Sequence, residues 1–412
     1  MTKKILVLTD SLNTEDSSGS KVNVAFIKNL VKFGFEIQVL SLIVPKGLEF
    51  EFLVDEIKPI KKWSYFLSRL QRRIQRIANL NLSVFLENKF GFSFTFFNES
   101  SSLQNGLENY NPKNYDLVIT LSKGESFRPH HAVLNNKYWH SKWLAYVHDP
   151  YPFQNYPRPY TFKPKGARQK DLFFKEVATC CRFAGFPSLL LAEHMASFYP
   201  EFNKKKVILP HQYQISKESV KLPTFFIEGK FNLVHAGNLL GGRSPEGLLK
   251  GFHLFLNNFP EALGVVNLYL VGPYTNYKNL ISDYKNTTGL IVNSNIPYRQ
   301  AILIQQEASV NIILEASDTD FSPFLPAKVA HSIFFDKPIL ALSPEKSEVR
   351  RLLSTDYPWQ CKADDASQIA QHIYNLYINW KSQPQTLNRP DLQEYFSSNY
   401  LGENINQLID EV

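Results

Sequence analysis

The feature that most constrains this chain is an alternation of strand, loop and helix that opens the sequence and starts again near residue 231. Ile5 to Leu8 is a continuous aliphatic run, as expected for a strand that is buried on both faces. Next comes a polar loop, and then a helical apolar pattern over Val22 to Phe33 that Gly34 terminates. A second strand is predicted over Phe35 to Leu42. Because this order opens a doubly wound sheet, we expect an α/β protein.

The second half repeats the pattern. Its predicted strands are Phe231 to His235, Val265 to Val271, Leu290 to Val292, Val310 to Leu314 and Pro338 to Leu342. Its predicted helices are Pro245 to Leu256, Tyr277 to Tyr284, Tyr298 to Glu307, Ala327 to Phe334, Ser347 to Leu353 and Ala366 to Trp380. Two such blocks in 412 residues predict two facing Rossmann-like domains, joined by the polar segment Pro200 to Lys230.

Other segments of the chain carry further predictions. Strands are expected at Tyr115 to Leu121 and Trp143 to His148, and helices at Lys170 to Phe183, Ser188 to Phe198 and Leu392 to Ile409. The phenylalanines between Phe90 and Phe97 alternate as in a strand or hairpin.

Composition excludes several classes of protein. With 44% hydrophobic and 20% charged residues the chain is too apolar to be disordered, and no apolar run approaches the length of about 20 residues that spans a bilayer. The N-terminus enters a strand without a signal-peptide core, so we expect a cytoplasmic protein. Cys180, Cys181 and Cys361 lack ligand spacing, and we expect buried thiols rather than a disulfide framework or a zinc site.

Basic residues gather between Lys58 and Leu86, where seven lysines and arginines occur without an acidic residue. Apolar residues recur there at helical spacing, and the arginines fall on another face (Trp63, Phe66, Leu67, Leu70, Ile74 and Ile77; Arg69, Arg72, Arg73 and Arg76). This helix either lies on an anionic membrane surface or packs on its own domain with a solvated basic face. Nucleic acid is not expected as a partner, because a net charge of +7 is a mild field over this length.

Ligands of open α/β sheets bind beyond the carboxyl ends of the strands, so the residues after each strand are informative. The loop after Phe231 to His235 holds three glycines, which let a backbone approach a ligand, and Arg243 just before a helix start that favours an anion. Lys328 and His331 lie three residues apart on one predicted helix face. These features indicate a diphosphate and ribose site, with a plain turn, a surface lysine and a half-buried histidine as the alternative.

The segment from Phe324 to Leu342 resembles the donor-site segment of GT-B glycosyltransferases. It is similar to the large retaining family 4, which includes sucrose synthases and many bacterial polysaccharide enzymes. Val234 to Gly251 resembles the phosphate region of that family, and His148-Asp149-Pro150 resembles its acceptor-side motif. The resemblance implies an acceptor-binding domain over 1–212 with the C-terminal helix 390–412 crossing back to it, and a nucleotide-sugar domain over 213–389.

The resemblance also implies roles for single residues. The implied donor-binding residues are Gly19, Gly237, Asn238, Arg243, Gly272, Pro297, Tyr298, Ser322, Phe324, Leu325, Lys328 and His331. Arg243 and Lys328 would stabilise the diphosphate charge, and His148 and Asp149 would position the acceptor hydroxyl, unless Asp149 only holds a strand-end turn. The sequence departs from the family at Asn238, which stands for an arginine, at Asp336, which stands for a glycine, and at Pro323 and His331, which stand where the family has glutamates.

The implied activity is transfer of a sugar from a UDP- or GDP-sugar to a saccharide or lipid-linked saccharide, with retention, in cell-surface polysaccharide or glycoconjugate synthesis. No metal or other cofactor is expected, since Asp318-Thr319-Asp320 is the only Asp-x-Asp candidate and lies in the donor-side loop. The expected location is the cytoplasm, at the inner face of the cell membrane if the basic helix binds lipid. Two alternatives stay open, a non-catalytic GT-B sugar-binding or scaffold protein and a nucleotide-sugar 2-epimerase.

Overall fold

The computed structural model describes residues 2–78, 82–214, 220–383 and 385–412. The chain packs as two units. Unit 1 comprises Met1–Tyr156, Thr161–Tyr213 and Phe396–Val412, and unit 2 comprises Pro157–Tyr160 and Gln214–Tyr395. The sequence placed the limits at 212 and 390 and gave all of 1–212 to the first domain. The structure therefore places Pro157–Tyr160 and residues 390–395 in the second unit.

Unit 1 is built on a seven-stranded parallel sheet with the order β3-β2-β1-β4-β5-β6-β7. Its strands are β1 (Lys4–Ser11), β2 (Glu36–Ile43), β3 (Leu53–Glu56), β4 (Leu117–Leu121), β5 (Trp143–Tyr146), β6 (Phe183–Phe186) and β7 (Lys206–Ile208). Both faces of the central strands are covered by apolar clusters, which explains the continuous aliphatic runs in the sequence. The strand order reverses between β1 and β4.

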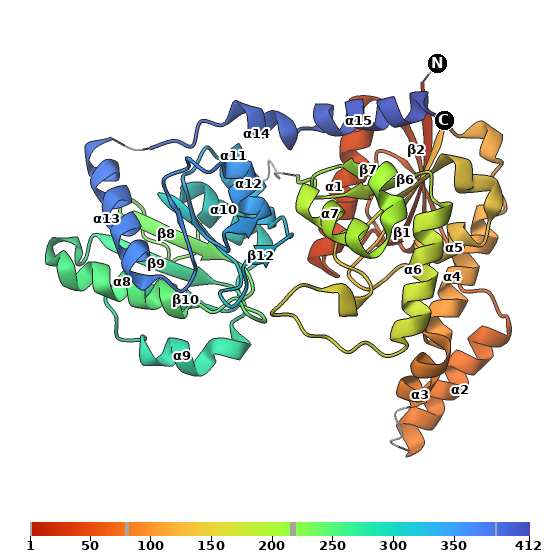
Figure 1. The fold of residues 1–412 in the computed structure, drawn as a ribbon, viewed down its shortest axis with the longest axis horizontal. Coiled ribbons are helices and arrows are strands. Elements are labelled where there is room, and N and C mark those ends of the chain that lie inside the picture. Colours follow the sequence, from red (N-terminus) through yellow and green to blue (C-terminus); the bar gives the residue numbers. More distant parts are fainter. Residues whose placement is uncertain (1, 79–81, 215–219, 384) are drawn as a thin grey trace. The chain divides into compact units, whose positions relative to one another are not determined.

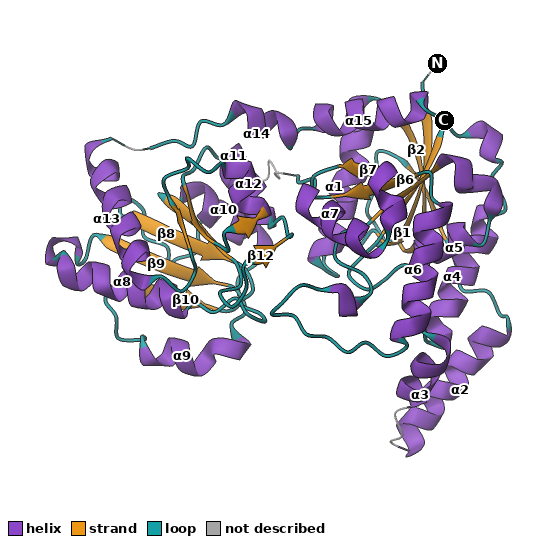
Figure 2. Ribbon diagram, viewed as in Figure 1, coloured by secondary structure: helices purple, strands orange, loops and turns teal. Residues whose placement is uncertain are grey.

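Helices flank this sheet (Figures 1 and 2). They are α1 (Ser18–Phe33), α2 (Trp63–Ala78), α3 (Leu82–Phe90), α4 (Phe94–Leu107), α5 (Arg128–Leu134), α6 (Ala167–Cys180), α7 (Leu189–Phe198) and α15 (Ser398–Asp410), with 3₁₀ turns at Pro112–Asn114, Lys137–Lys142, Phe153–Asn155 and Pro200–Lys204. Helix α15 packs on α1, so the C-terminal end of the chain returns to unit 1 as predicted. The contact is close, because a Cβ at Gly402 would lie 2.0 Å from the Phe33 ring.

Unit 2 is built on a six-stranded parallel sheet with the order β10-β9-β8-β11-β13-β15. Its strands are β8 (Phe231–Ala236), β9 (Val266–Val271), β10 (Leu290–Asn293), β11 (Val310–Leu314), β13 (Ile339–Leu342) and β15 (Gln360–Cys361), and β12 (Phe321–Ser322) pairs with β14 (Lys346–Ser347). Its helices are α8 (Glu246–Asn258), α9 (Lys278–Asp283), α10 (Tyr298–Glu307), α11 (Ala327–Phe334), α12 (Glu348–Leu353), α13 (Ala366–Ser382) and α14 (Pro390–Tyr395), with 3₁₀ turns at Pro260–Ala262 and Thr275–Tyr277. The order reverses between β8 and β11, which matches the reversal in unit 1.

Three predictions of local structure are wrong. The helix predicted over Lys170 to Phe183 ends at Cys180, and Phe183 begins strand β6. The aromatic segment expected as a strand enters helix α4, because Ser93 accepts a hydrogen bond from the Phe96 amide and the Phe92 and Phe96 rings stack at 4.0 Å in the core. The predicted single helix Leu392 to Ile409 is two helices, because Ser397 caps α15 by accepting from the Tyr400 amide.

Burial of Cys181 and Cys361 agrees with the prediction of buried thiols, whereas Cys180 is only partly buried. All three are free thiols. No helix in the described part of the chain is both long enough and apolar enough to cross a bilayer.

Candidate functional site

The sheet of unit 2 reverses its order between β8 and β11, and this position is where open α/β sheets bind ligands. His235 of β8 reaches across it and donates its Nδ1 proton to the Ile312 carbonyl of β11 at 3.2 Å. Gly237 follows β8, and Glu315 follows β11. The carboxyl ends of the two central strands thus present a glycine, a carboxylic acid and a buried imidazole at one place.

Lys328 enters this place from the first turn of helix α11. A Cβ added to Gly237 would lie 2.4 Å from the Lys328 Nζ, so the ammonium group lies directly against the Gly237 backbone. Gly272 at the end of β9 is equally constrained, because a Cβ there would lie 2.7 Å from the Gly237 carbonyl oxygen. The two glycines predicted as ligand contacts therefore also allow β8, β9 and α11 to meet.

The electrostatics of this cluster favour an anion. Burial, together with the Arg243 guanidinium, lowers the pKa of Lys328 to about 7. Burial and the two cations hold the pKa of His235 well below its usual value, and burial with Lys328 lowers the pKa of His331 to about 4. The site therefore holds a lysine whose charged form is disfavoured by burial and by Arg243, beside two neutral imidazoles. A bound phosphate would relieve that cost.

Glu315 is the acidic member of the cluster and is 3% exposed. Burial raises its pKa to about 7, although the Ser322 hydroxyl, the Arg243 guanidinium, the Ser347 hydroxyl and Arg350 all act to lower it. Ser322 donates a hydrogen bond to Glu315 Oε1. Ser322 and Glu315 line a small cavity with Arg158, Arg243 and Phe324. Glu315 thus fixes the predicted donor loop at Ser322.

The segment Pro157–Tyr160 covers the glycine-rich loop of unit 2. A Cβ at Gly241 would lie 2.6 Å from the Tyr160 ring, and one at Gly242 would lie 2.4 Å from Pro159. The Tyr160 ring also meets the Phe324 ring edge-on, with centroids 5.8 Å apart. This segment brings Arg158 to the cavity beside Arg243.

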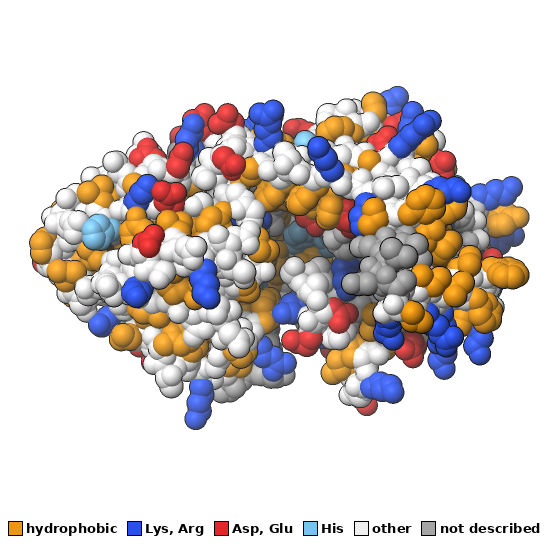
Figure 3. Space-filling view, turned by 90° about the horizontal axis from the view of Figure 1, so that it is seen from below, with side chains coloured by type: hydrophobic (Ala, Val, Ile, Leu, Met, Phe, Trp, Pro, Cys, Tyr) orange, Lys and Arg blue, Asp and Glu red, His pale blue; other side chains and the backbone are white. Residues whose placement is uncertain are grey.

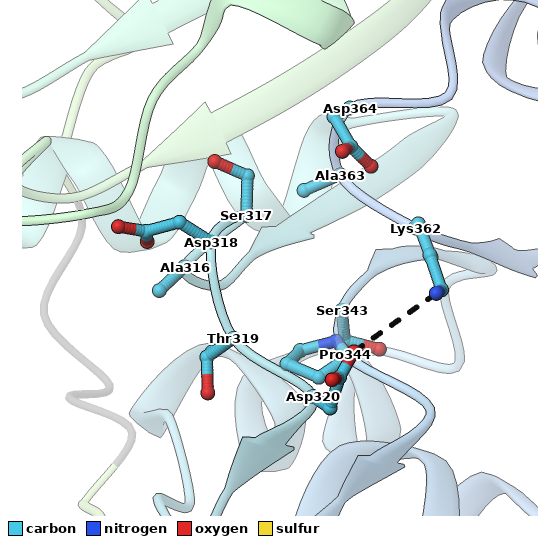
Figure 4. A pocket seen from close by; sticks show the side chains of 10 residues that line it. All are labelled: Ala316, Ser317, Asp318, Thr319, Asp320, Ser343, Pro344, Lys362, Ala363 and Asp364. Atoms are coloured by element: carbon cyan, nitrogen blue, oxygen red, sulfur yellow. Dashed lines mark ion pairs between the residues drawn. The ribbon is translucent and has the colours of Figure 1, made fainter. Parts of the chain in front are cut away.

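The loop after β11 borders a second hollow, of ≈ 190 Å³, lined by residues that follow β11, β13 and β15 (Figure 4). Asp318 and Asp320 lie on it, and Lys362 Nζ lies 4.0 Å from Asp320. Within the described ranges no group of three or more His, Cys, Asp or Glu side chains could hold a metal ion. The expectation of a metal-free site stays a prediction.

The remaining predicted donor residues are more peripheral. Asn238 is exposed in the glycine-rich loop, and Pro297 and Tyr298 form the N-terminal end of α10. Leu325 is buried, and His331 lies 3.4 Å from Gln305 of α10 through its Nδ1. The structure thus brings Gly237, Arg243 and Lys328 together. Asn238, Pro297 and Tyr298 lie at the same edge of the sheet.

The corresponding edge of unit 1 holds His148, which is 5% exposed and follows β5. The Asn23 amide donates to the Ser122 carbonyl at 3.1 Å, which turns the Asn23 oxygen toward His148 Nε2 at 2.6 Å. His148 Nδ1 lies 3.1 Å from His211 Nε2. His148 Nε2 must donate its proton to the Asn23 oxygen, so in the neutral ring His148 Nδ1 accepts the hydrogen bond from His211 Nε2. Both ring nitrogens of His148 therefore have hydrogen-bond partners.

These contacts suit His148 to positioning rather than to proton abstraction. Burial, with His211 and His130 nearby, lowers its pKa well below the usual value. Asp149 follows it, partly buried. Gly19, an implied donor-binding residue, and Ser20 lie in the first turn of α1, which Ser17 caps, and not in the polar loop that precedes this helix. A Cβ at Gly19 would lie 3.3 Å from Lys123.

Sequence reasoning missed His235, Glu315, Arg158 and the partners of His148. Two signals were present. His235 is a histidine at the carboxyl end of the predicted strand Phe231 to His235, and Glu315 directly follows the predicted strand Val310 to Leu314.

No family model matches this sequence, and no curated protein matches it. Solved structures do match it over its whole length. A glycosyltransferase from Rickettsia africae has a TM-score of 0.63 at 11% identity and covers 100% of this chain and 98% of its own. The apo lipopolysaccharide outer core galactosyltransferase WaaB has a TM-score of 0.58 at 12% identity, with 99% of each chain covered. The trehalose-6-phosphate synthase OtsA has a TM-score of 0.61 at 9% identity and covers 99% of this chain and 98% of its own.

Two parallel doubly wound sheets of matching order, with a C-terminal helix that returns to the first unit, define the GT-B class of fold. This chain has that fold, and the three solved structures named above are glycosyltransferases.

Proposed function

We propose that this protein is a glycosyltransferase whose unit 2 binds a nucleotide-diphosphate sugar. The observation that carries the proposal is the Lys328 ammonium held against Gly237, with Arg243 close enough to lower its pKa, at the point where the strand order reverses. Two cations that are costly without an anion suit a diphosphate that gains charge as the sugar leaves. UDP- and GDP-sugars are the proposed donors, and no metal is part of the proposal.

The resemblance of Phe324 to Leu342 to family 4 extends the proposal to a retaining reaction. In such a reaction the departing phosphate oxygen takes the acceptor proton on the same face, so no enzymic base is required. His148 fits this scheme, because both of its ring nitrogens have hydrogen-bond partners and the residue can position the acceptor without acting as a base. Arg243 and Lys328 then supply the charge, and binding supplies the orientation.

The acceptor proposed for unit 1 is a saccharide or a lipid-linked saccharide, placed by His148 and Asp149. This assigns the protein to cell-surface polysaccharide or glycoconjugate synthesis in the cytoplasm, at the inner face of the cell membrane when the acceptor is lipid-linked. A non-catalytic sugar-binding protein is the second candidate, because Pro323 and His331 occupy the positions of the two glutamates that the family uses.

Nucleotide release from a panel of UDP-, GDP- and ADP-sugars, with and without saccharide acceptors, tests the proposal. We expect release that depends on the acceptor and is lost in the Lys328→Ala and Arg243→Ala variants, but not in the exposed Lys278→Ala control. Binding of a nucleotide sugar without turnover would favour the non-catalytic protein, and epimerised sugar nucleotide would favour a 2-epimerase.

A further inference from the structure

Helix α2 exposes its apolar face and buries polar residues against the rest of unit 1. Ser68 and Gln71 are 3% and 8% exposed, and α2 packs on α4. Four large apolar side chains point to solvent instead: Trp63 is 83% exposed, Phe66 56%, Leu70 53% and Ile77 86%. Leu67 and Ile74 of the predicted stripe are partly buried, but the other four residues do not pack this helix on its own domain, which was one of the two alternatives from the sequence.

The exposed apolar residues form one stripe. At about 100° per residue, positions 63, 66, 70 and 77 fall within an arc of roughly 60°. Arg69, Arg73 and Arg76 are exposed and fall on the adjoining arc, and the Arg69 guanidinium lies over the Tyr65 ring at 4.6 Å. A solvent-facing apolar stripe bordered by arginines is the pattern of a helix that lies in a membrane interface.

Helix α3 continues the surface. Phe85 is 66% exposed and Phe90 43% exposed, and the Lys89 ammonium lies over the Phe90 ring at 5.4 Å. Apolar and basic side chains lie next to one another at the right-hand end of the view in Figure 3. The apolar residues and the cations of α2 and α3 together are called the α2–α3 surface below. Residues 79–81, within the predicted basic stretch, lie outside the described residues.

We propose that the α2–α3 surface binds an anionic lipid bilayer. The apolar stripe would enter the boundary between headgroups and acyl chains, and the arginines would contact lipid phosphates. From Lys58 to Leu86 the chain carries no acidic residue, so the surface complements a negative membrane. A second copy of this chain would bring two basic surfaces together. A nucleic acid would contact the arginines but leave Trp63 and Ile77 in water.

Co-sedimentation of the full-length protein with vesicles tests the charge component. We expect binding to vesicles of phosphatidylglycerol and phosphatidylcholine in equal amounts, little binding to phosphatidylcholine alone, and weakening by salt. The Arg73→Gln/Arg76→Gln variant should lower the partition coefficient by about thirtyfold. The matched control is Lys278→Gln/Lys285→Gln, two exposed lysines of unit 2, which should bind as the wild type does.

The apolar component has its own measurement. Of the five tryptophans, Trp139 and Trp143 are buried and Trp63 is the most exposed, so Trp63 should give most of a blue shift in emission on vesicle binding. The Trp63→Ala/Leu70→Ser variant should lose both the shift and most of the binding. Its side chains are exposed, so its unfolding temperature should stay at the wild-type value.

The inference does not rest on the proposed function, and both variants should release nucleotide with a soluble acceptor at the wild-type rate. Absence of binding to anionic vesicles would overturn it, as would undiminished binding by both variants. Self-association that the apolar variant abolishes, without vesicle binding, would overturn it in favour of a second copy.

Discussion

At the residue scale, the account depends on a lysine whose charge the folded protein disfavours. Replacing Lys328 by methionine should keep the fold, because it removes a charge from a site where burial lowers the pKa to about 7. The same change should weaken binding of a UDP- or GDP-sugar by about tenfold to a hundredfold, the value of one charge-assisted hydrogen bond. Titration calorimetry on wild type, Lys328→Met and the exposed control Lys278→Met measures this, and equal affinities would contradict it.

Glu315 gives a prediction about pH. Its pKa in the folded protein is about 7, above its usual value of 4.5, so the unfolded chain loses the proton first as the pH rises. Its contribution to stability is therefore complete below about pH 4.5, is lost as the pH rises to about 7 and stays lost above that. Denaturant unfolding should show that Glu315→Gln loses less stability than wild type between these limits, by up to about 3 kcal/mol. Parallel pH profiles for the two proteins would show that Glu315 does not titrate in this range.

Whether a site residue could be predicted depended on how far apart in the sequence it and its partners lie. Gly237, Arg243 and Lys328 could be found because each lies in a local motif, a glycine-rich loop or a helix start. His235 and Ile312 hydrogen-bond across 77 residues of sequence, and no local spacing reports such a pair. Arg158 could not be assigned because it lies in the first half of the chain and packs in unit 2.

At the element scale, the segment Pro157–Tyr160 is the least expected part of the site. We expect Arg158→Ala to weaken binding of a nucleotide sugar several-fold, because Arg158 borders the cavity with Arg243. The exposed neighbour Lys163→Ala is the matched control. Fluorescence or calorimetric titration measures the affinity of both variants. Wild-type affinity in the Arg158→Ala variant would refute a role for Arg158.

The type of an element could be predicted from the spacing of its apolar residues where that spacing fitted a helix or a strand alone. The runs at Val310 to Leu314 and Ala327 to Phe334 match β11 and α11, because each has the pattern of its own period. The phenylalanines between Phe90 and Phe97 misled the prediction, because rings two residues apart imitate a strand while Ser93 caps a helix. Tertiary packing of Phe92 on Phe96 decides the outcome there.

At the scale of the whole molecule, the return of α15 to unit 1 is a testable constraint. Gly402→Leu places a side chain where a Cβ would already lie 2.0 Å from the Phe33 ring. We expect a loss of about 1–3 kcal/mol in the free energy of unfolding, typical of overpacking. The exposed neighbour Glu403→Leu serves as control, and equal stabilities of the two variants in urea would show that α15 does not need this contact.

The fold class could be predicted from the whole chain because two blocks of strand and helix alternate in it, and each block gives a sheet of the same order. Donor, acceptor and stereochemistry depend on a few side chains, and the sequence departs from the family at several of them. The function therefore rests on the cation cluster of unit 2 rather than on the fold, because one fold hosts many reactions.

A crystal structure of the protein with bound UDP or GDP is the most direct measurement of that claim. We expect diphosphate oxygens within hydrogen-bonding distance of Lys328 Nζ and the Arg243 guanidinium, beside the Gly237 backbone. A nucleotide bound instead in the hollow between Asp318 and Lys362, with Lys328 out of reach of its phosphates, would contradict the account.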